Sequence, residues 1–227
     1  MNGVFVTGTD TDIGKTEIAL ALMAALQQRG LTVMGMKPVA TGCAADQRGL
    51  VCGDALRLQS RSSHQADYPL INPYAFVPAI APHLAAREAG VEISLERIRA
   101  SFGTLAADAD LVVVEGVGGW RVPLAQELAV SDLPTALGLP VVLVVGIRLG
   151  CLSHALLTVE AIRGRGARLA GWVANIVAPR MHNRDENIQT LEEMIDAPNL
   201  GVVPWQMEVH TEVIARQLDV GPLLPEG

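Results

Sequence analysis

Residues 8–16, GTDTDIGKT, have the composition of a loop that holds phosphate. Such a loop points backbone N–H groups and a helix N-terminus at an anion, while a lysine bridges the outer phosphates and a hydroxyl binds magnesium. Gly14, Lys15 and Thr16 meet that requirement, although Gly8 stands one place earlier than the standard spacing asks. Because an apolar run precedes the loop and a helical stretch follows it, the sequence predicts that Lys15 and Thr16 hold the phosphates and magnesium of a nucleotide.

Lys37 and Glu115 each follow or end a short apolar run. An ammonium at Lys37 is suited to stabilise charge on a transferred phosphoryl group or on a carboxylated substrate, but a solvated surface lysine fits the sequence equally well. Glu115 precedes glycine-rich residues 116–119 and is suited to be a second acidic ligand of magnesium; the alternative is a solvated acid at a strand end. Nothing in the spacing of Asp54 places it near the nucleotide, so it is interpreted as a helix-capping acid.

The elements that must position these residues are short β-branched runs that alternate with longer helical stretches. The runs are apolar on both faces, as are parallel strands that helices cover on each side. The sequence therefore predicts an α/β fold with a doubly wound, mainly parallel sheet and helices on both faces. The predicted strands cover residues 4–6, 32–34, 111–114, 141–145, 171–174 and 201–203.

Five helices are predicted, and a glycine follows three of them at the place where helices commonly end. The helices cover residues 15–28, about 94–107, 131–137, 152–163 and about 183–195, and the glycines are Gly30, Gly138 and Gly164. The proline-rich segment 70–82 is predicted to be a structured loop, with Pro82 suited to begin a short helix.

Ligands of an open parallel sheet bind outside the carboxyl ends of its strands. Five of the predicted strands end at residues with functional potential: the phosphate loop, Lys37, residues 115–119, residues 148–150 and Asn175. We expect all five ends to line one crevice.

Composition narrows the class of protein. The chain has 227 residues, 50% of them hydrophobic, and residues 1–227 are interpreted as a single α/β domain. No run of about 20 apolar residues offers a membrane span, and the N-terminal residues do not resemble a secretory signal, so a soluble cytoplasmic protein is expected. The net charge of −7, without a basic cluster, argues against nucleic-acid or membrane partners and favours small molecules. Three cysteines without metal-ligand spacing indicate neither a disulfide framework nor a zinc site.

Five motifs, taken together, resemble those of the dethiobiotin synthetase family of the P-loop NTPase superfamily. They are GTDTDIGKT at 8–16, KPVATG at 37–42, VEGVGGW at 114–120, LGC at 149–151 and GWVAN at 171–175. The resemblance runs from about residue 3 to about residue 206. It accounts for the displaced Gly8, because the phosphate loop of this family has this spacing.

The resemblance implies a homodimeric cytoplasmic enzyme of biotin biosynthesis. With ATP, Mg²⁺ and carbon dioxide, such an enzyme converts 7,8-diaminopelargonate to dethiobiotin, ADP and phosphate. One substrate amine takes up carbon dioxide as a carbamate, ATP phosphorylates the carbamate to a mixed anhydride, and the second amine closes the ureido ring. The protein must supply positioning and charge stabilisation.

The resemblance also implies roles for individual residues. The catalytic set would be Lys37, Lys15 and Thr11, and Mg²⁺ would be bound by Thr16, Asp54 and Glu115. The ATP site would comprise Asp12, Ile13, Gly14, Lys15, Thr16, Glu17, Asp54, Glu115, Gly116, Val117, Gly118, Asn175, Pro204, Trp205 and Gln206. The substrate site would comprise Thr41, Gly150, Cys151, Leu152 and Ser153, with the substrate carboxylate received at a helix N-terminus of the neighbouring subunit.

Some positions depart from the family pattern. Thr41 stands where serine is common, which retains the hydroxyl, and Ser153 replaces an asparagine with a shorter donor. Beyond about residue 178 the match thins, and no role is assigned past Gln206. The five histidines are scattered without metal-ligand spacing and are interpreted as structural or solvent-facing.

Two other classes of protein share parts of the pattern. A P-loop switch or partitioning ATPase would also start with strand, loop and helix, but it would have a lysine early in the phosphate loop, where this chain has Thr9, Asp10 and Thr11. It would also leave the KPVAT segment unexplained. The synthetase half of a glutamine-dependent amidotransferase would need a glutaminase domain, for which 227 residues leave no room.

Overall fold

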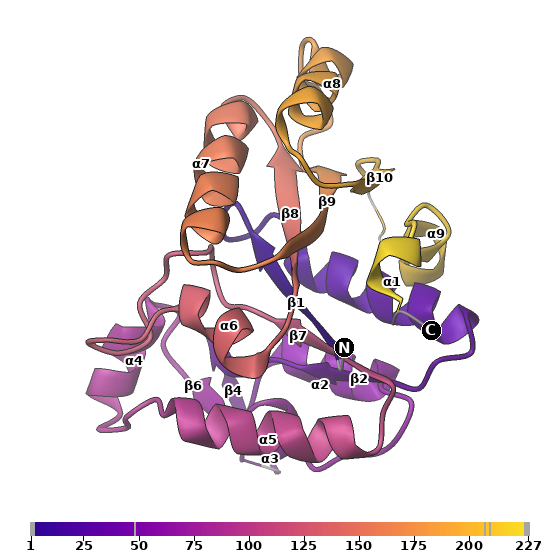
Figure 1. The fold of residues 1–227 in the computed structure, drawn as a ribbon. Coiled ribbons are helices and arrows are strands. Elements are labelled where there is room, and N and C mark those ends of the chain that lie inside the picture. Colours follow the sequence, from indigo (N-terminus) through magenta and orange to yellow (C-terminus); the bar gives the residue numbers. More distant parts are fainter. Residues whose placement is uncertain (1–2, 48, 207, 209, 225–227) are drawn as a thin grey trace.

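The computed structural model describes residues 3–47, 49–206, 208 and 210–224. Six parallel strands form its central sheet in the order β10-β9-β8-β1-β7-β2 (Figure 1). They are β1 (Gly3–Gly8), β2 (Val33–Met36), β7 (Leu111–Glu115), β8 (Val141–Ile147), β9 (Leu169–Ile176) and β10 (Asn199–Val203). Every residue of β1, β2, β7 and β8 is buried, as the two-sided apolar runs predict.

Helices cover both faces of this sheet (Figure 1). One face packs against α1 (Lys15–Gln28), part of α2 (Gly53–Arg61) and α9 (Thr211–Ala215). The other face packs against α3 (Tyr68–Ile71), α4 (Pro82–Glu88), α5 (Leu95–Ala107), α6 (Leu133–Leu137), α7 (Cys151–Gly164) and α8 (Arg184–Met194). Short 3-10 turns at Val130–Asp132 and Gly221–Leu223 complete the helical elements of the described chain. The predicted doubly wound α/β fold is confirmed.

The order of the strands places a ligand crevice beside β1. After β1 the chain crosses to β2 at one edge, returns to β7 next to β1, and then continues to β8 on the other side of β1. At such a reversal the loops that follow neighbouring strands diverge and leave room for a ligand at their carboxyl ends. The phosphate loop, which follows β1, lies at this point.

The local predictions agree with the structure except at three places. Gly30 and Gly138 have left-handed φ angles of 85° and 68° where helices end, but Gly164 lies inside α7, and Gly166 has the left-handed φ of 69°. The 131–137 stretch begins as a 3-10 turn before α6. The segment 70–82 is more ordered than a loop, because β6 (Tyr74–Phe76) pairs in parallel with β3 (Val39–Thr41) and α4 begins at Pro82 as predicted.

A hairpin that the sequence does not reveal connects β3 to α2. It consists of β4 (Ala44–Asp46) and β5 (Gly49–Val51), paired antiparallel. The two small sheets and α2 together form a layer over the β2 edge of the main sheet. This layer brings Thr41 and Asp54 to the same end of the sheet as the phosphate loop.

Candidate functional site

The phosphate loop has the backbone conformation that anion binding requires. Asp12 and Gly14 have left-handed φ angles of 54° and 82°, and Gly14 is the N-cap of α1, so the helix N-terminus opens onto the loop. A Cβ atom at Gly14 would lie 2.4 Å from the Asn175 amide nitrogen, which excludes any larger residue. That same amide donates to the Ile13 carbonyl at 2.7 Å and fixes the loop against β9.

A second glycine loop, residues 116–119, packs against the first. Gly118 has a left-handed φ of 62°, and a Cβ atom there would lie 3.6 Å from the Thr11 hydroxyl. A Cβ atom at Gly119 would lie 3.4 Å from the Gly8 carbonyl oxygen. The loops after β1 and β7 therefore lie close to each other, with Thr11 at their junction.

Opposite charges converge beside the phosphate loop. Lys37 Nζ donates to Asp54 Oδ2 at 2.6 Å and to Glu115 Oε1 at 2.7 Å, and the Thr16 hydroxyl donates to Glu115 Oε1 at 2.7 Å. Lys37 is 5% exposed and Glu115 is 1% exposed. Charged side chains are seldom buried to this degree without a partner, and here each compensates the other.

Burial and the neighbouring charges shift the two lysines in opposite directions. Burial lowers the pKa of Lys15 to about 8, with Glu115 acting against it and Lys37 adding to it. For Lys37, burial also acts to lower the pKa, but Glu115 and Asp54 outweigh it and raise the pKa above the usual value. Burial acts to raise the pKa of Asp54, whereas Lys37 and the Thr16 hydroxyl hold it below the usual value. Lys37 is thus a fixed cation, and Lys15 is a lysine whose charge is costly until an anion joins it.

Hydrogen bonds to its backbone also fix the position of Lys37. Its N–H donates to the Ile71 carbonyl at 2.8 Å, and its carbonyl accepts from the Asn72 amide at 2.7 Å. The Tyr68 hydroxyl donates to Asn72 Oδ1 at 2.9 Å and accepts from the Cys52 N–H at 2.7 Å, immediately before α2. One hydrogen-bond chain therefore joins the strand end that carries Lys37 to the helix that carries Asp54.

The oxygen atoms at this point fit a bound Mg²⁺. Glu115 Oε2 is buried and has no hydrogen-bond partner. The Thr16 hydroxyl donates to the other oxygen of Glu115, and the Asp54 carboxylate shares the Lys37 ammonium with Glu115. Mg²⁺ prefers hard oxygen ligands and is often held by one or two carboxylates together with substrate phosphates. Within the described chain, no group of three His, Cys, Asp or Glu side chains could hold a metal on its own.

A cavity of about 740 Å³ opens over these side chains. The predicted site residues that line it are Thr11, Asp12, Gly14, Lys15, Thr16, Glu17, Lys37, Thr41, Asp54, Glu115, Val117 and Gly118. The carboxyl ends of β1, β2 and β7 therefore share one crevice, as expected.

The other two strand ends do not line this cavity, which corrects the prediction that all five do. Asn175, after β9, contacts the phosphate loop from behind, and Arg148, after β8, forms an ion pair with Asp10. Both support the loop instead of facing the cavity. Ile13 is 1% exposed beneath the loop, because it fills the space beside Gly8 and Gly146.

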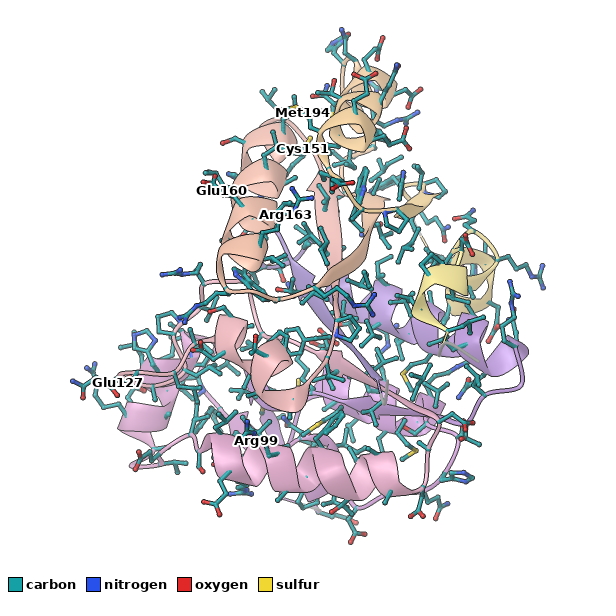
Figure 2. The ribbon with its side chains drawn as sticks, viewed as in Figure 1. Arg99, Glu127, Cys151, Glu160, Arg163 and Met194 are labelled. Atoms are coloured by element: carbon teal, nitrogen blue, oxygen red, sulfur yellow. The ribbon has the colours of Figure 1, made fainter. Side chains whose placement is uncertain are left out.

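The remaining predicted residues lie at two other places. Pro204, Trp205 and Gln206 follow β10 and are largely outside the core, with Trp205 43% exposed. Residues 150–153 form the start of α7, where Cys151 is buried against α8 (Figure 2). In a single chain, neither group lines the cavity.

Several residues that line the cavity were not predicted from the sequence. Arg57 on α2 forms a two-pronged ion pair with Glu17 at 2.5 and 2.6 Å, and Ala79, Ile80, Ala81, Pro82 and Val122 form an apolar wall. Nothing in the spacing marks Arg57. A different signal was available for the lysines: Lys15 and Lys37 are the only lysines among the 17 basic residues of the sequence, and both lie in this site.

Known proteins resemble this chain over most of its length. The family described as "AAA domain" matches residues 2–213. The ATP-dependent dethiobiotin synthetase BioD of Pseudomonas paraeruginosa is 54% identical over 98% of this chain and 98% of its own. That of Aromatoleum aromaticum is 54% identical over 94% and 95%, and that of Xanthomonas campestris pv. campestris is 49% identical over 94% and 96%.

This chain belongs to the dethiobiotin synthetase family. Among solved structures, the cell division protein MinD of Aquifex aeolicus aligns with a TM-score of 0.56 at 13% identity, covering 97% of this chain and 89% of its own. A ParA family ATPase of Chlorobium tepidum aligns with a TM-score of 0.53 at 16% identity, covering 90% and 84%. These two likenesses show the P-loop NTPase fold alone. A dethiobiotin synthetase is an ATP-dependent ligase of biotin biosynthesis, and P-loop enzymes use ATP with Mg²⁺.

Proposed function

We propose that this chain joins carbon dioxide to 7,8-diaminopelargonate and closes the ureido ring of dethiobiotin, with cleavage of ATP to ADP and phosphate. The observation that carries the proposal is the convergence of Lys37, Asp54, Glu115 and Thr16 beside the phosphate loop. Phosphoryl transfer to a carbamate places negative charge between the attacking and leaving oxygens, and fixed cations at that point lower its energy.

Lys37 is proposed to stabilise charge on the carbamate and on the phosphoryl group that it receives. Its two carboxylate partners keep it protonated, so it acts as a fixed cation and not as a base. Lys15 is proposed to bridge the outer phosphates of ATP, with Asp12 to Glu17 wrapping the triphosphate and Thr11 contacting the transferred group. An anionic ligand at Lys15 offsets the burial that lowers its pKa to about 8.

Thr16, Asp54 and Glu115 are proposed to hold Mg²⁺, which shields phosphate charge when bound. Gly116, Val117 and Gly118 would contact the nucleotide from the neighbouring loop. The unpartnered Glu115 Oε2 supports this assignment, because a buried carboxylate oxygen without a donor is costly unless a cation or a water completes it.

The cavity beyond Thr41 is proposed to hold the diamine. Its wall of Ala79, Ile80, Ala81, Pro82 and Val122 suits an aliphatic chain, while Thr41 offers a hydroxyl at the reacting end. The carboxylate of the substrate would reach residues Gly150, Cys151, Leu152 and Ser153 of a second subunit. Since Cys151 is buried, the helix N-terminus, and not its thiol, would receive the anion.

A homodimer is proposed on the same grounds. Leu149 is 94% exposed and Leu157 is 61% exposed, and both lie at or on α7, next to the residues that would bind the partner's substrate. Large apolar side chains gathered at one surface commonly mark an interface.

We further propose that residues 1–227 form one P-loop domain with small-molecule partners and a cytoplasmic location. In the described parts of the chain, no helix has both the length and the apolarity of a membrane span.

The adenine is proposed to lie near Asn175 and the segment Pro204, Trp205 and Gln206. The exposed indole of Trp205 is available to stack on a base, and Asn175 stands directly behind the phosphate loop. A Trp205→Ala variant with unchanged affinity for ATP would exclude the stacking role.

The function is tested by phosphate release from Mg·ATP with bicarbonate, in the presence and absence of 7,8-diaminopelargonate, followed by mass analysis for the cyclic urea. Release that requires the diamine and yields dethiobiotin is expected. Hydrolysis that ignores the diamine, or that a protein partner stimulates, would favour the switch ATPase that shares this fold.

A further inference from the structure

Cys43 and Cys52 face each other at the base of the β4–β5 hairpin. The hairpin pairs Ala44 with Val51, and one further step in the same register sets residue 43 opposite residue 52. Facing residues of an antiparallel pair have Cα atoms about 4.5 or 5.5 Å apart. Both separations lie within the range of about 4.4–6.8 Å that a disulfide spans. The Cys43 thiol donates to the Ala40 carbonyl at 3.6 Å, and the two thiols lie close enough to shift the pKa of each other.

Backbone hydrogen bonds hold both cysteines in this register. The Cys43 N–H donates to the Phe76 carbonyl of β6 at 2.9 Å, and the Cys52 N–H donates to the Tyr68 hydroxyl at 2.7 Å. The pairing therefore does not depend on the exposed hairpin tip. Both cysteines are free thiols, 5% and 6% exposed.

The third cysteine has no such partner geometry. Cys151 is 2% exposed at the start of α7, among apolar side chains of α7, α8 and the sheet. It provides an internal comparison, because it is a buried thiol of the same chain that does not face another cysteine across a hairpin.

We propose that Cys43 and Cys52 are a dithiol that a small hydroperoxide oxidises to a reversible disulfide. In the first step, the thiolate of one cysteine attacks the O–O bond of hydrogen peroxide, which forms a sulfenic acid and releases water after the leaving hydroxide takes a proton. In the second step, the sulfur of the other cysteine loses its proton and attacks the sulfenic sulfur, which forms the S–S bond and expels a second water. The protein loses two electrons and two hydrogens, and the peroxide becomes two waters.

The bond would form at the edge of the cavity already described. Cys43 is two residues after Thr41, and Cys52 is two residues before Asp54, both of which line that cavity. The disulfide would fix the intervening hairpin at its base. This inference rests on the hairpin register, so it does not rest on the proposed function.

The test uses the full-length chain, first reduced and then freed of reductant. One sample receives about equimolar hydrogen peroxide and another receives none. Both are then unfolded in the presence of an alkylating reagent, which labels the free thiols. The samples are digested without reductant and analysed by mass spectrometry. The expected result is that Cys43 and Cys52 appear mainly in one linked peptide pair lighter by two hydrogens, while Cys151 is alkylated as in the untreated sample. Treatment with a dithiol reductant should return both cysteines to the alkylated form.

Variants distinguish the pair from general oxidation. Cys151→Ser should form the same linked peptides, whereas Cys43→Ser should leave Cys52 as a sulfenic acid or a more oxidised form without any link. Unchanged alkylation of Cys43 and Cys52 after peroxide would overturn the proposal. Oxidation of Cys52 beyond the sulfenic acid in the wild-type chain, or links only between different chains, would overturn it equally.

Discussion

At the carboxyl ends of β1, β2 and β7, the charged side chains of Lys15, Lys37 and Glu115 are buried and depend on one another. At the amino ends of β2 and β7, Asp110 is exposed and accepts hydrogen bonds from the backbone and hydroxyl of Thr32 at 2.8 and 2.7 Å. The carboxylates of both arrangements accept hydrogen bonds, but only the first arrangement removes its charged groups from water. Burying an ion pair commonly costs more than its attraction returns, so apolar residues would hold the carboxyl ends together at least as well.

We therefore infer that the buried charges at the carboxyl ends serve function and that the exposed carboxylate of Asp110 serves stability. A change at the carboxyl ends should alter catalysis first. A change at the amino ends should alter only the stability and its dependence on pH. The variants below test this division, beginning with the largest expected effect.

Replacing Lys37 by alanine should have the largest effect. We expect kcat to fall by about 10²–10³-fold, the range for loss of one preorganised donor to transition-state charge, while the affinity for ATP changes little. Steady-state phosphate release with the diamine, together with ATP titration, measures both quantities. Lys37→Arg is the matched control, since it retains the charge but not the compact ammonium. Normal turnover of Lys37→Ala would remove this side chain from the mechanism.

Replacing Thr16 by valine should weaken Mg²⁺-dependent nucleotide binding by at least about tenfold, because the side chain loses a hard oxygen and keeps its shape. The Mg²⁺ concentration that half-saturates ATP turnover is the quantity to measure. Thr16→Ser keeps the hydroxyl and should behave as the wild type. If valine and serine give the same Mg²⁺ titration, the hydroxyl is not a ligand.

Replacing Tyr68 by phenylalanine should break the hydrogen-bond chain behind Lys37. The hydroxyl donates to Asn72 and accepts from the Cys52 N–H, and each lost buried hydrogen bond is worth about 1–3 kcal/mol. We expect kcat to fall up to about tenfold, with KM for ATP unchanged, and the protein to be less stable. Tyr74→Phe is the matched control, because its hydroxyl accepts from the Ser94 N–H at 2.8 Å and has no link to Lys37 through that hydroxyl. An equal loss of kcat in both variants would show that general destabilisation, and not positioning, is responsible.

Replacing Asp110 by asparagine should have the smallest effect and none on kcat. The backbone and hydroxyl of Thr32 hold the pKa of Asp110 below its usual value. Since the pKa is lower in the folded state, the ionised carboxylate stabilises the fold above the unfolded pKa, and this contribution is lost as the pH falls through the folded pKa. Urea unfolding at pH values from about 6 to about 3 should therefore show a steeper loss of stability for the wild type than for the variant. Parallel profiles would contradict this role.

The sequence predicts the central sheet well because its strands carry strong local signals. β7 and β8 are runs rich in valine, and helices α1 and α5 have the predicted bounds to within a residue. The three-residue strands β3 to β6 are too short for periodicity to indicate. The pairing of β3 with β6 depends on contacts between segments about 35 residues apart, as between Val39 and Tyr74.

The residues of the candidate site likewise differ in how well the sequence predicts them. Lys15, Thr16, Lys37 and Glu115 follow strands, so the rule for parallel sheets indicates them directly. Asp54 could not be placed from spacing, because the β4–β5 hairpin and α2 bring it to the site, and only the family resemblance assigned it to that site. Its interpretation as a helix-capping acid is wrong, because Cys52 is the N-cap of α2 and the Asp54 carboxylate accepts from Lys37 instead. Arg57 was missed for the same reason, since its partner Glu17 is 40 residues away in the sequence.

The division between functional and structural charge is tested most directly by the double variant Lys37→Met/Glu115→Gln. It removes the buried ion pair while the glutamine keeps an acceptor for the Thr16 hydroxyl. We predict a free energy of unfolding no lower than that of the wild type, measured in urea, together with loss of diamine-dependent phosphate release. A free energy of unfolding lower by about 3–5 kcal/mol, with phosphate release retained, would show that the pair holds the fold together and would contradict the account.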